Sequence, residues 1–512
     1  MQVQNIYLKY LKESHLYLGL FAILFFYIST FFGTITVLKP YLNSWESPSK
    51  HITLIDKEKI DLDSSINAGL NQLGNPTNKI KITLPSSLKT SISMKFGHSE
   101  KIYIDPNTNK ILDSSKEENL LSDFFNQMHI SVNMSRPGQI LMGLASISII
   151  FLTISGIYLW LLNRKKRSKE KSFWFRWHKD ISLIMLPYII VFALSGAVLG
   201  VMLLASSPFA YSATDGKETI MGKLVRPAVF TRAVKIRASG EKAQMLEFSK
   251  LHEKAKSNYS NLHIKEISLY NWKDKNSRIV FSGYLKDNSI LTARVNRAHL
   301  VLNGETGEIV RKIGLENTHG GAQFLSAFYF FHFITDEGAI FRAIYVILGI
   351  AFAISLVFGA FIWIERKLSK LKEQKKFFHI IPKITTAFTI GIIPATTFSL
   401  FLYWALDFNM DNRNTWIIGG FYTMWSFTFL YSVYKKDALD ATKLFMYLNA
   451  IFLILAVLLH GNATNMYIWN SFSNSIWDIF AMDLFFLICG VLSFLFAKNM
   501  DRLNFLNRFR GY

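Results

Sequence analysis

Histidine is a common ligand of metal ions and of haem iron, and two histidines of this chain begin a repeated pattern. His129 precedes Gly156 by 27 residues, and His332 precedes Gly359 by the same 27 residues. A tryptophan follows each of the two histidines after 31 residues. Matching distances without a gap are typical of an internal repeat, so the two stretches are expected to form equivalent helices.

A second pair of histidines follows another regular spacing. Gly33 lies 18 residues after His15, and Gly196 lies 18 residues after His178. Eighteen residues make five turns of an α-helix and rise about 27 Å, close to the thickness of the hydrocarbon core of a membrane. Each glycine should therefore share a helix face with its histidine and lie near the opposite membrane surface.

The four histidines are expected to form two layers. Successive membrane helices run antiparallel, so His15 and His178 should lie near the cytoplasmic surface, and His129 and His332 near the outer surface. Helix bundles build cofactor sites from facing side chains in their core. Two neutral imidazoles on opposite sides of a cavity can act as axial ligands of a haem iron. The pattern therefore predicts one haem in each layer.

A haem ring needs small residues beside it, and the four glycines meet that requirement. Gly33 and Gly196 are expected at the level of the outer histidines, and Gly156 and Gly359 at the level of the inner ones. Basic side chains near the two levels could neutralise haem propionates. They are Arg136 and Arg342 on the outer side, and Arg176 and Lys179 on the inner side.

Each of these residues also has a plainer interpretation. A histidine at a membrane interface is often only a hydrated polar side chain, and glycine in membrane helices often serves close helix packing. The shared register of four histidines and four glycines favours the haem interpretation. His319, in the sequence NTHGGAQF, is either an external substrate or metal contact or, more simply, a loop histidine beside a Gly-Gly turn.

The elements that carry these residues are expected to be membrane helices. Half of the 512 residues are hydrophobic, and they are gathered in long runs. Eight runs approach the ~20 residues that span a bilayer. The expected spans are 16–38, 139–162, 181–204, 340–364, 384–405, 416–434, 444–460 and 478–497. The sequence therefore predicts a polytopic α-helical membrane protein.

The formal net charge of +21 is concentrated in a few connections between the spans. Lysines and arginines crowd the connections after the second, fourth and sixth spans, whereas 406–415 and 461–477 share one basic residue, Arg413. By the positive-inside rule, both termini lie in the cytoplasm and the long segments 39–138 and 205–339 lie outside. This distribution indicates a membrane orientation signal and not a nucleic-acid surface. The single cysteine excludes an intrachain disulfide.

Both external segments contain alternating apolar and polar residues with turn signals between them. Strands are expected at 79–85 and 101–112 in the first segment, and at 263–270, 278–285, 290–296 and 300–310 in the second. IYIDPNTNKIL and LVLNGETGEIV share a strand, turn and strand form, so the repeat should include the external segments. Each segment is expected to form an α+β domain.

The sequence contains no Walker loop, dinucleotide fingerprint, zinc-spaced Cys/His cluster or nucleophile elbow. No site for a nicotinamide or a nucleoside triphosphate is therefore visible. Electrons for any haem must come from a separate donor.

The stretches around the four histidines resemble the PepSY-associated transmembrane family, whose members include bacterial inner-membrane siderophore-iron reductases. The matching stretches are SHLYLGLFAILFFYISTFFG, MHISVNMSRPGQILMG with its ISGIYLW ending, RWHKDISLIMLPYIIVFALSG, and FHFITDEG with its FGAFIW ending. With the external segments they cover roughly residues 1 to 370. The resemblance implies a four-helix core with two b-type haems and two external PepSY-like domains. Its implied axial ligands are His15, His178, His129 and His332. The four additional C-terminal spans depart from the shorter family members and leave the oligomeric state and the donor open.

The resemblance also implies a function, a transmembrane reductase of the bacterial inner membrane. Electrons from a cytoplasmic reduced flavin or reductase, or from a quinone, would pass to ferric iron held by a siderophore in the periplasm. Two alternatives stay open: a haem-free sensor or peptidase modulator whose PepSY-like domains bind protein partners, and a transporter that uses the last four spans. A lack of ionisable residues deep in those spans argues against the transporter.

The expected division of the chain follows from these observations. The N-terminal half is expected to contain the cytoplasmic N-terminus and first span (1–38), the first external domain (39–138), and the second and third spans with their basic loop (139–204). The second external domain (205–339) and the fourth span with a basic loop (340–383) should follow. The fifth to eighth spans (384–497) and a cytoplasmic tail (498–512) complete the expected division.

Overall fold

The chain divides into two compact units. The computed structural model describes residues 2–502 apart from 54–55, 57–58, 75, 77–78, 87–88, 98–100, 114–118, 164–172, 221–222, 225–236, 335–337, 371–379 and 436. The helical unit comprises Met1–Glu46, Glu118–Leu204 and Ala343–Tyr512. The sheet unit comprises Ser47–Glu117 and Ala205–Arg342.

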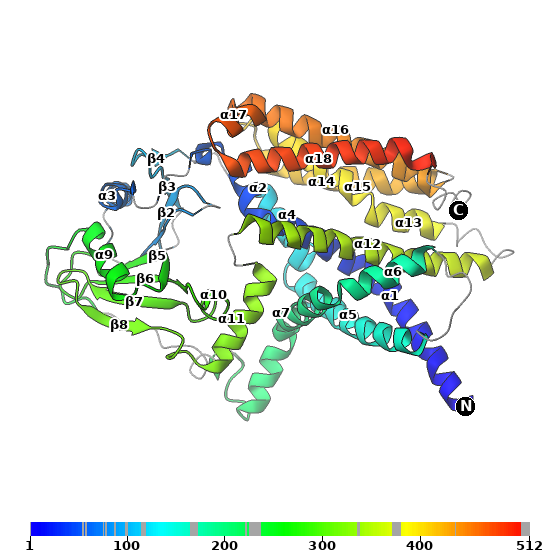
Figure 1. Cartoon of the computed structure of the whole chain (residues 1–512), viewed down its shortest axis with the longest axis horizontal. Coiled ribbons are helices and arrows are strands. Elements are labelled where there is room, and N and C mark those ends of the chain that lie inside the picture. Colours follow the sequence, from blue (N-terminus) through cyan, green and yellow to red (C-terminus); the bar gives the residue numbers. More distant parts are fainter. Residues whose placement is uncertain are drawn as a thin grey trace. The chain divides into compact units, whose positions relative to one another are not determined.

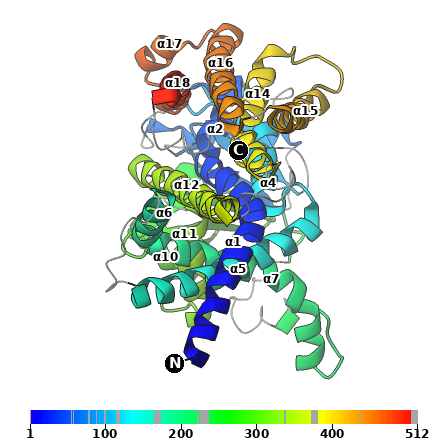
Figure 2. The same ribbon diagram turned by 90° about the vertical axis from the view of Figure 1, so that its right-hand side faces the viewer.

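Four long helices of the helical unit pack around one core. They are α1 (Gln2–Val37), α5 (Ser135–Asn163), α7 (Leu186–Ala213) and α12 (Ala339–Lys370). Each of the four contributes a large buried side chain, namely Phe26, Ile149, Ile189 and Phe352. Figure 2 shows α1 running beside α5. Because apolar residues occur all round these helices, the sides that do not pack are also hydrophobic.

The third expected span is two helices and not one. α6 (Phe173–Ile184) meets α7 at a 74° bend. Pro187 lies in the first turn of α7, where it has no N–H to continue the helical hydrogen bonds of α6. The expected separation of about 27 Å between His178 and Gly196 assumed one straight helix and is therefore wrong.

The C-terminal third of the helical unit is a second group of helices. They are α13 (Ile380–Thr389), α14 (Ile392–Ala405), α15 (Arg413–Tyr434), α16 (Ala438–Thr464), α17 (Ile468–Ser473) and α18 (Trp477–Asn499), followed by a 3-10 turn, η4 (Met500–Arg502). Figure 1 shows α14, α16 and α18 side by side. α13 and α14 together form one candidate span, Ile380–Ala405, which confirms the fifth expected span.

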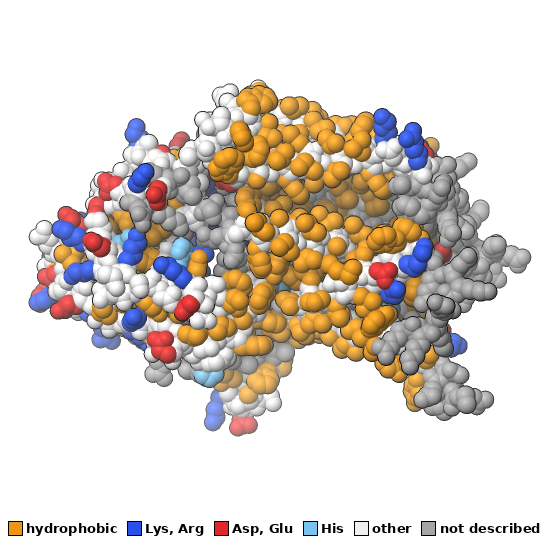
Figure 3. All heavy atoms as spheres, in the orientation of Figure 1, with side chains coloured by type: hydrophobic (Ala, Val, Ile, Leu, Met, Phe, Trp, Pro, Cys, Tyr) orange, Lys and Arg blue, Asp and Glu red, His pale blue; other side chains and the backbone are white. Residues whose placement is uncertain are grey.

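The helical unit has the surface and the helix lengths of a membrane protein. Among the described residues, five helices are long and apolar enough to cross a membrane, or up to seven if the bent pairs in α1 and in α6–α7 each count as one span. Figure 3 shows hydrophobic side chains covering the visible surface of this unit. The sixth expected span forms the helix α15. This helix is not one of the candidate membrane spans, because polar and small residues lower its mean hydropathy. The basic segments 164–172 and 371–379 lie outside the described residues, so the membrane orientation stays a prediction.

The sheet unit contains one antiparallel sheet of eight strands. They are β1 (Ile80–Thr83), β2 (Ile92–Phe96), β3 (Ile102–Ile104), β4 (Ile111–Leu112), β5 (Leu262–Tyr270), β6 (Arg278–Leu285), β7 (Ala298–Asn303) and β8 (Ile309–Ile313). Their order is β4-β3-β2-β1-β5-β6-β7-β8, so the first strands of two four-stranded copies pair with each other. Ile82 of β1 is opposite Ile267 of β5. The two external segments therefore share one sheet, and the expectation of two separate domains is corrected.

Each copy of the sheet has its own helix and the same final hairpin. α3 (Leu62–Gln72) precedes β1, and α9 (Phe248–Asn258) precedes β5. In the first hairpin Asp105 N–H donates to the Lys110 carbonyl at 2.9 Å, and in the second Asn303 N–H donates to Glu308 at 2.9 Å. The repeat expected from the two strand, turn and strand stretches is thus present. The expected strand 290–296 is instead occupied in part by the short helix α10 (Ser289–Thr292).

Four further elements belong to the described part of the chain. α2 (Lys39–Trp45) and α4 (Leu120–Ser131) both belong to the helical unit, so the first external segment is shorter than 39–138. The turn η1 (Pro48–Lys50) and the helix α11 (Gly320–Phe333) belong to the sheet unit. α4 and α11 precede α5 and α12, and each ends in a residue with a left-handed backbone, Val132 or Ile334.

Candidate histidine site

The two histidines expected in the inner layer each lie against a glycine of a neighbouring helix. His15 of α1 lies beside α5, where a Cβ placed on Gly156 would be 3.3 Å from the imidazole Cε1. His178 of α6 lies beside α12, where a Cβ on Gly359 would be 3.3 Å from Cε1. Such distances are shorter than ordinary van der Waals contacts, so glycine is what lets each imidazole approach the helix.

His129, expected in the outer layer, has the same kind of neighbour. It lies in the last turn of α4 and packs on α1, where a Cβ on Gly33 would be 2.9 Å from Nδ1. Ser29 lies one helical turn before Gly33, and its hydroxyl donates to the His129 carbonyl at 2.9 Å. A serine and a glycine on one face of α1 therefore hold the end of α4.

Backbone carbonyls fix the tautomer of two of these imidazoles. The Nδ1 atom of His129 lies 2.8 Å from the Ser29 carbonyl oxygen, and that of His178 lies 2.8 Å from the Ser355 carbonyl oxygen. A carbonyl oxygen can only accept, so Nδ1 must carry the proton in the neutral imidazole. The lone pair is then on Nε2, the nitrogen that binds a metal in this tautomer.

A serine hydroxyl is the hydrogen-bond partner of His15. Its Nδ1 lies 2.8 Å from Ser155 Oγ, and the same Oγ lies 3.2 Å from the Leu152 carbonyl oxygen. When the hydroxyl donates to Leu152, it accepts from His15 Nδ1–H, and the lone pair of His15 is then on Nε2, as in His129 and His178.

A buried carboxyl group positions the helix that carries His129. The Glu46 carboxyl oxygens accept hydrogen bonds from the backbone N–H groups of Leu121 and Ser122 at 2.7 and 2.8 Å, which caps the start of α4. Tyr403 of α14 donates its hydroxyl to the Glu46 carbonyl at 2.7 Å. The C-terminal helices therefore help to hold α4 in place.

The fourth histidine and the fourth glycine behave differently. His332 is near the end of α11 in the sheet unit, where its ring lies 5.1 Å from the ring of Phe333. A Cβ on Gly196 would lie 2.5 Å from Ser146 Oγ of α5, and the next turn brings Gly200 against Gly143. For Gly196 the plainer interpretation, close packing of two helices, describes the observed contacts. The outer pair His129 and His332 stays a prediction.

Three of the four basic residues that were expected near propionates lie on the surface of the helical unit or close to it. Arg136 and Arg176 are exposed. Lys179 is half-buried and pairs with Asp180 at 2.9 Å.

Two residues that were expected near the outer surface have structural partners in the sheet unit. The buried Arg342 guanidinium donates to the Ile334 carbonyl at 3.0 Å, at the end of α11. His319 is the residue before α11, and its Nδ1 accepts from Gly321 N–H at 3.0 Å. This contact is a helix N-cap, which agrees with the plainer interpretation of His319.

A haem iron needs fewer protein ligands than a metal ion bound by side chains alone. Among the described residues, no group of three or more His, Cys, Asp and Glu residues could hold a metal ion. A haem iron needs only two protein ligands, and the neutral histidines provide the Nε2 lone pairs. Trp363, one turn after Gly359, has a buried indole N–H with no hydrogen-bond partner in the described part of the chain. Such a donor suits the anionic edge of a cofactor.

Sequence reasoning missed the serines and one buried carboxyl group. Ser29 and Ser355 act through backbone carbonyls, which leave no mark in a residue pattern. Asp483 of α18 is fully buried, accepts from Trp45 Nε1 at 2.9 Å and lies 3.2 Å from His460 Nδ1. The statement that the last spans lack ionisable residues is therefore corrected. An aspartate inside an apolar run was the signal that could have revealed it.

The comparisons with known proteins agree with the helical core. No match is found among curated proteins. The family model described as the PepSY-associated TM region matches residues 13–366, which include all four predicted histidines. The match covers more than half of the chain, and the protein therefore belongs to the PepSY-associated TM region family as a multi-pass membrane protein.

Proposed function

We propose that the protein is a dihaem reductase of the bacterial inner membrane that passes electrons to ferric siderophore iron in the periplasm. The observation that carries the proposal is the shared environment of His15, His129 and His178. Each imidazole lies against a glycine and uses Nδ1 in a hydrogen bond, and for His129 and His178 the carbonyl acceptor leaves the lone pair on Nε2. Metal-ligating histidines usually have this second hydrogen bond.

In this proposal the histidines hold two b-type haems, which would supply one-electron transfer when bound. His15 and His178 serve the inner haem, and His129 and His332 serve the outer one. The glycines provide room beside the rings, and the Ser29, Ser155 and Ser355 contacts keep the imidazoles in their tautomer. Arg136, Arg176 and Lys179 are the basic candidates for propionate contacts on the helical unit.

The partners in the proposal lie on the two sides of the membrane. A reduced flavin, a reductase or a quinone would donate electrons, and a ferric siderophore would accept them outside. Reduction to ferrous iron weakens binding by hard oxygen ligands, so the metal would be released. The sheet unit would provide the docking surface for this substrate.

The transporter alternative gains one observation from Asp483. Membrane carboxylates often mark transport paths. Asp483, however, accepts from Trp45 and lies next to His460, so it links α2, α16 and α18. This structural use agrees with the reductase and does not require a transport path.

An optical spectrum of the purified protein from haem-replete cells tests the proposal. Reduction with dithionite should give a sharp α-band and about two haems per chain. A colourless preparation would overturn the proposal and favour a haem-free sensor or a transporter.

Histidine variants then test the two layers. His15→Ala and His178→Ala should each remove the inner haem, whereas His129→Ala and His332→Ala should each remove the outer one. His319→Ala, which removes only a helix cap, is the matched control and should keep both haems. Loss of both haems from every histidine variant would contradict two separate layers.

A further inference from the structure

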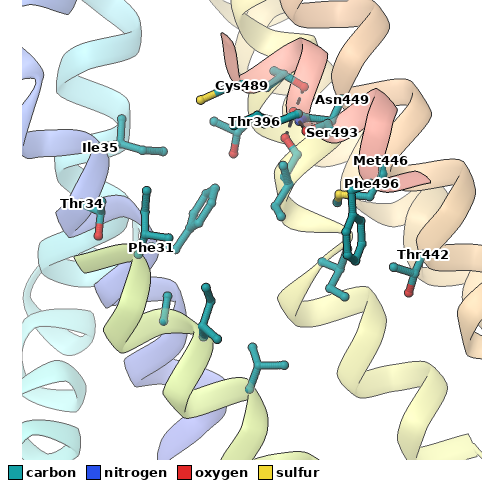
Figure 4. Close-up of a pocket in the computed structure, with 18 of the residues that line it drawn as sticks. Phe31, Thr34, Ile35, Thr396, Thr442, Met446, Asn449, Cys489, Ser493 and Phe496 are labelled. Carbon is teal, nitrogen blue, oxygen red and sulfur yellow. Dashed lines mark hydrogen bonds between the residues drawn. The ribbon is translucent and has the colours of Figure 1, made fainter. Parts of the chain in front are cut away.

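A large apolar cavity lies between the two groups of helices in the helical unit. Its volume is about 660 Å³, and its walls come mainly from α1, α12, α14, α16 and α18. Figure 3 shows the surface hollowed between α12 and α18, and Figure 4 shows the lining side chains. None of the lining residues is Lys, Arg, Asp or Glu, so among the described residues the cavity has no charged group for an ionic ligand.

One polar pair interrupts the apolar wall. Asn449 of α16 and Ser493 of α18 both line the cavity, and Asn449 Nδ2 donates to Ser493 Oγ at 2.6 Å. Asn449 is only 4% exposed, and its Oδ1 has no hydrogen-bond partner in the described part of the chain. A buried amide oxygen without a donor is costly, so a ligand with a donor would be stabilised there.

The pair of Asn449 and Ser493 can also donate a hydrogen bond to an acceptor group of a ligand. Turning the Asn449 amide by a half rotation would let its oxygen accept from the Ser493 hydroxyl and present its NH₂ group to the cavity. The pair is therefore able to bind either a hydroxyl group or a carbonyl group. Thr396 and Thr442 do not compete for this role, because their hydroxyls donate to carbonyls of their own helices.

The cavity wall touches the level of the inner histidines. Trp174 lines the cavity and lies one helical turn before His178 on α6. Phe358 also lines it and is the chain neighbour of Gly359, the glycine against His178. One wall of the cavity is thus shared with the candidate inner site.

The wall also touches the level of His129. Phe125 lines the cavity and lies one turn before His129 on α4. Thr34 lines it and is the chain neighbour of Gly33, the glycine against His129. A ligand in this cavity would therefore lie beside both candidate haem levels.

We propose that this cavity binds a membrane quinone and its quinol. Asn449 and Ser493 would bind an oxygen of the ring, and the apolar walls would hold the isoprenoid tail. A phospholipid suits the cavity less well, because its headgroup is charged and no lining residue is Lys, Arg, Asp or Glu. The quinol deepens the proposed function as its lipid-soluble electron donor, since oxidation to the quinone releases two electrons, one for each haem in turn, and two protons to water. In that respect the inference rests on the proposed function.

The test uses the full-length protein, purified and reconstituted in lipid nanodiscs. Organic extraction of the purified protein followed by mass spectrometry should recover a quinone above its level in the bulk membrane. Equilibrium binding of a short-chain quinone, decylubiquinone, should saturate at one site per chain. Both readouts measure binding and need no reductase activity.

Two variants and a control locate the site. Asn449→Leu removes the polar pair and should weaken decylubiquinone binding about tenfold, the effect of one lost buried hydrogen bond. Ala353→Phe adds bulk to a lining position on α12 and should weaken binding at least as much. Ile347→Phe on the same helix, at a position that is 66% exposed, is the control and should bind normally.

The outcomes separate this inference from the proposed function. Recovery of phospholipid alone, or unchanged binding in both Asn449→Leu and Ala353→Phe with a monodisperse protein, would overturn the quinone site. If haems are present but no quinone binds, only this inference fails. If quinone binds to a haem-free protein, the site stands and the reductase fails.

Discussion

His178 Nδ1 lies 2.8 Å from the carbonyl oxygen of Ser355, one helical turn before the glycine that makes room for the same imidazole. The arrangement needs two features on one helix face. One is a backbone carbonyl that accepts from the imidazole Nδ1–H, and the other is a glycine four residues later. His129 meets the same two features on α1. Because the acceptor is part of the backbone, the position of α12 or α1 sets the direction of the imidazole.

The first prediction concerns Gly33. Gly33→Ala places a Cβ 2.9 Å from His129 Nδ1, which is too close, so the imidazole must move. We expect loss of the outer haem, or a shift of its midpoint potential, with the inner haem retained. Haem content and redox titration of the purified variant measure this. Gly419→Ala, where the new Cβ has nothing within 4 Å, is the control. A Gly33→Ala protein with two unchanged haems would contradict the assigned contact.

The second prediction concerns Ser155, which acts on His15 through its side chain. Ser155→Ala removes the acceptor of His15 Nδ1, and loss of such a partner typically weakens a metal site about 10–100-fold. We expect faster transfer of the inner haem to apomyoglobin, and Ser155→Thr should restore the normal rate. Ser355→Ala keeps the carbonyl that binds His178, so its effect should be smaller. Equal effects of Ser155→Ala and Ser355→Ala would argue against the side-chain role.

The sequence predicted most of the long helices and three of the four histidine–glycine neighbours. Long apolar runs predict membrane helices directly. Because the rise per residue of a helix is constant, the number of residues between two positions predicts how far apart they lie across the membrane. Gly33, Gly156 and Gly359 do lie beside histidines, as their spacing required. Whether the histidines bind haem is a chemical question that spacing alone cannot answer.

Other features depend on contacts that spacing does not encode. The single sheet is held by β1 and β5, whose paired residues Ile82 and Ile267 are far apart in sequence. The bend at Met185 breaks the register between His178 and Gly196. The Ser355 carbonyl is an acceptor that every residue type has. Such features follow from tertiary packing and therefore need the structure.

The third prediction is a pH dependence from Glu46. Burial raises the pKa of Glu46 to about 8 from its ordinary value of 4.5. The backbone N–H groups of Leu121 and Ser122 lower the pKa, but their effect is smaller than that of burial. The folded protein therefore binds this proton more tightly than the unfolded chain. The resulting stabilisation is complete below pH 4.5 and is lost as the pH rises through about 8.

Glu46→Gln tests this pH dependence, because the amide cannot ionise. The glutamine NH₂ group cannot accept one of the two backbone N–H bonds, so the variant should be less stable than the wild type near pH 5. Its thermal stability should, however, change less than that of the wild type between pH 5 and pH 9, measured by unfolding in detergent. Glu13→Gln, at an exposed position of α1, is the control and should leave the profile unchanged. Parallel profiles for the wild type and Glu46→Gln would refute the contribution of Glu46.

The last prediction concerns Asp483, which joins α18 to α2 and α16. Asp483→Leu leaves the buried Trp45 indole without its acceptor and removes the group beside His460, at an expected cost of about 3 kcal/mol. Trp45 is next to Glu46, which caps the helix of His129, so the outer haem should also be lost more easily. Asp483→Asn keeps an acceptor for Trp45 and should be milder, and Leu484→Ala at the half-exposed neighbouring position is the control. Thermal unfolding and haem content of the three variants measure these effects. A stable Asp483→Leu protein with both haems would mean that the last helices do not support the histidine site.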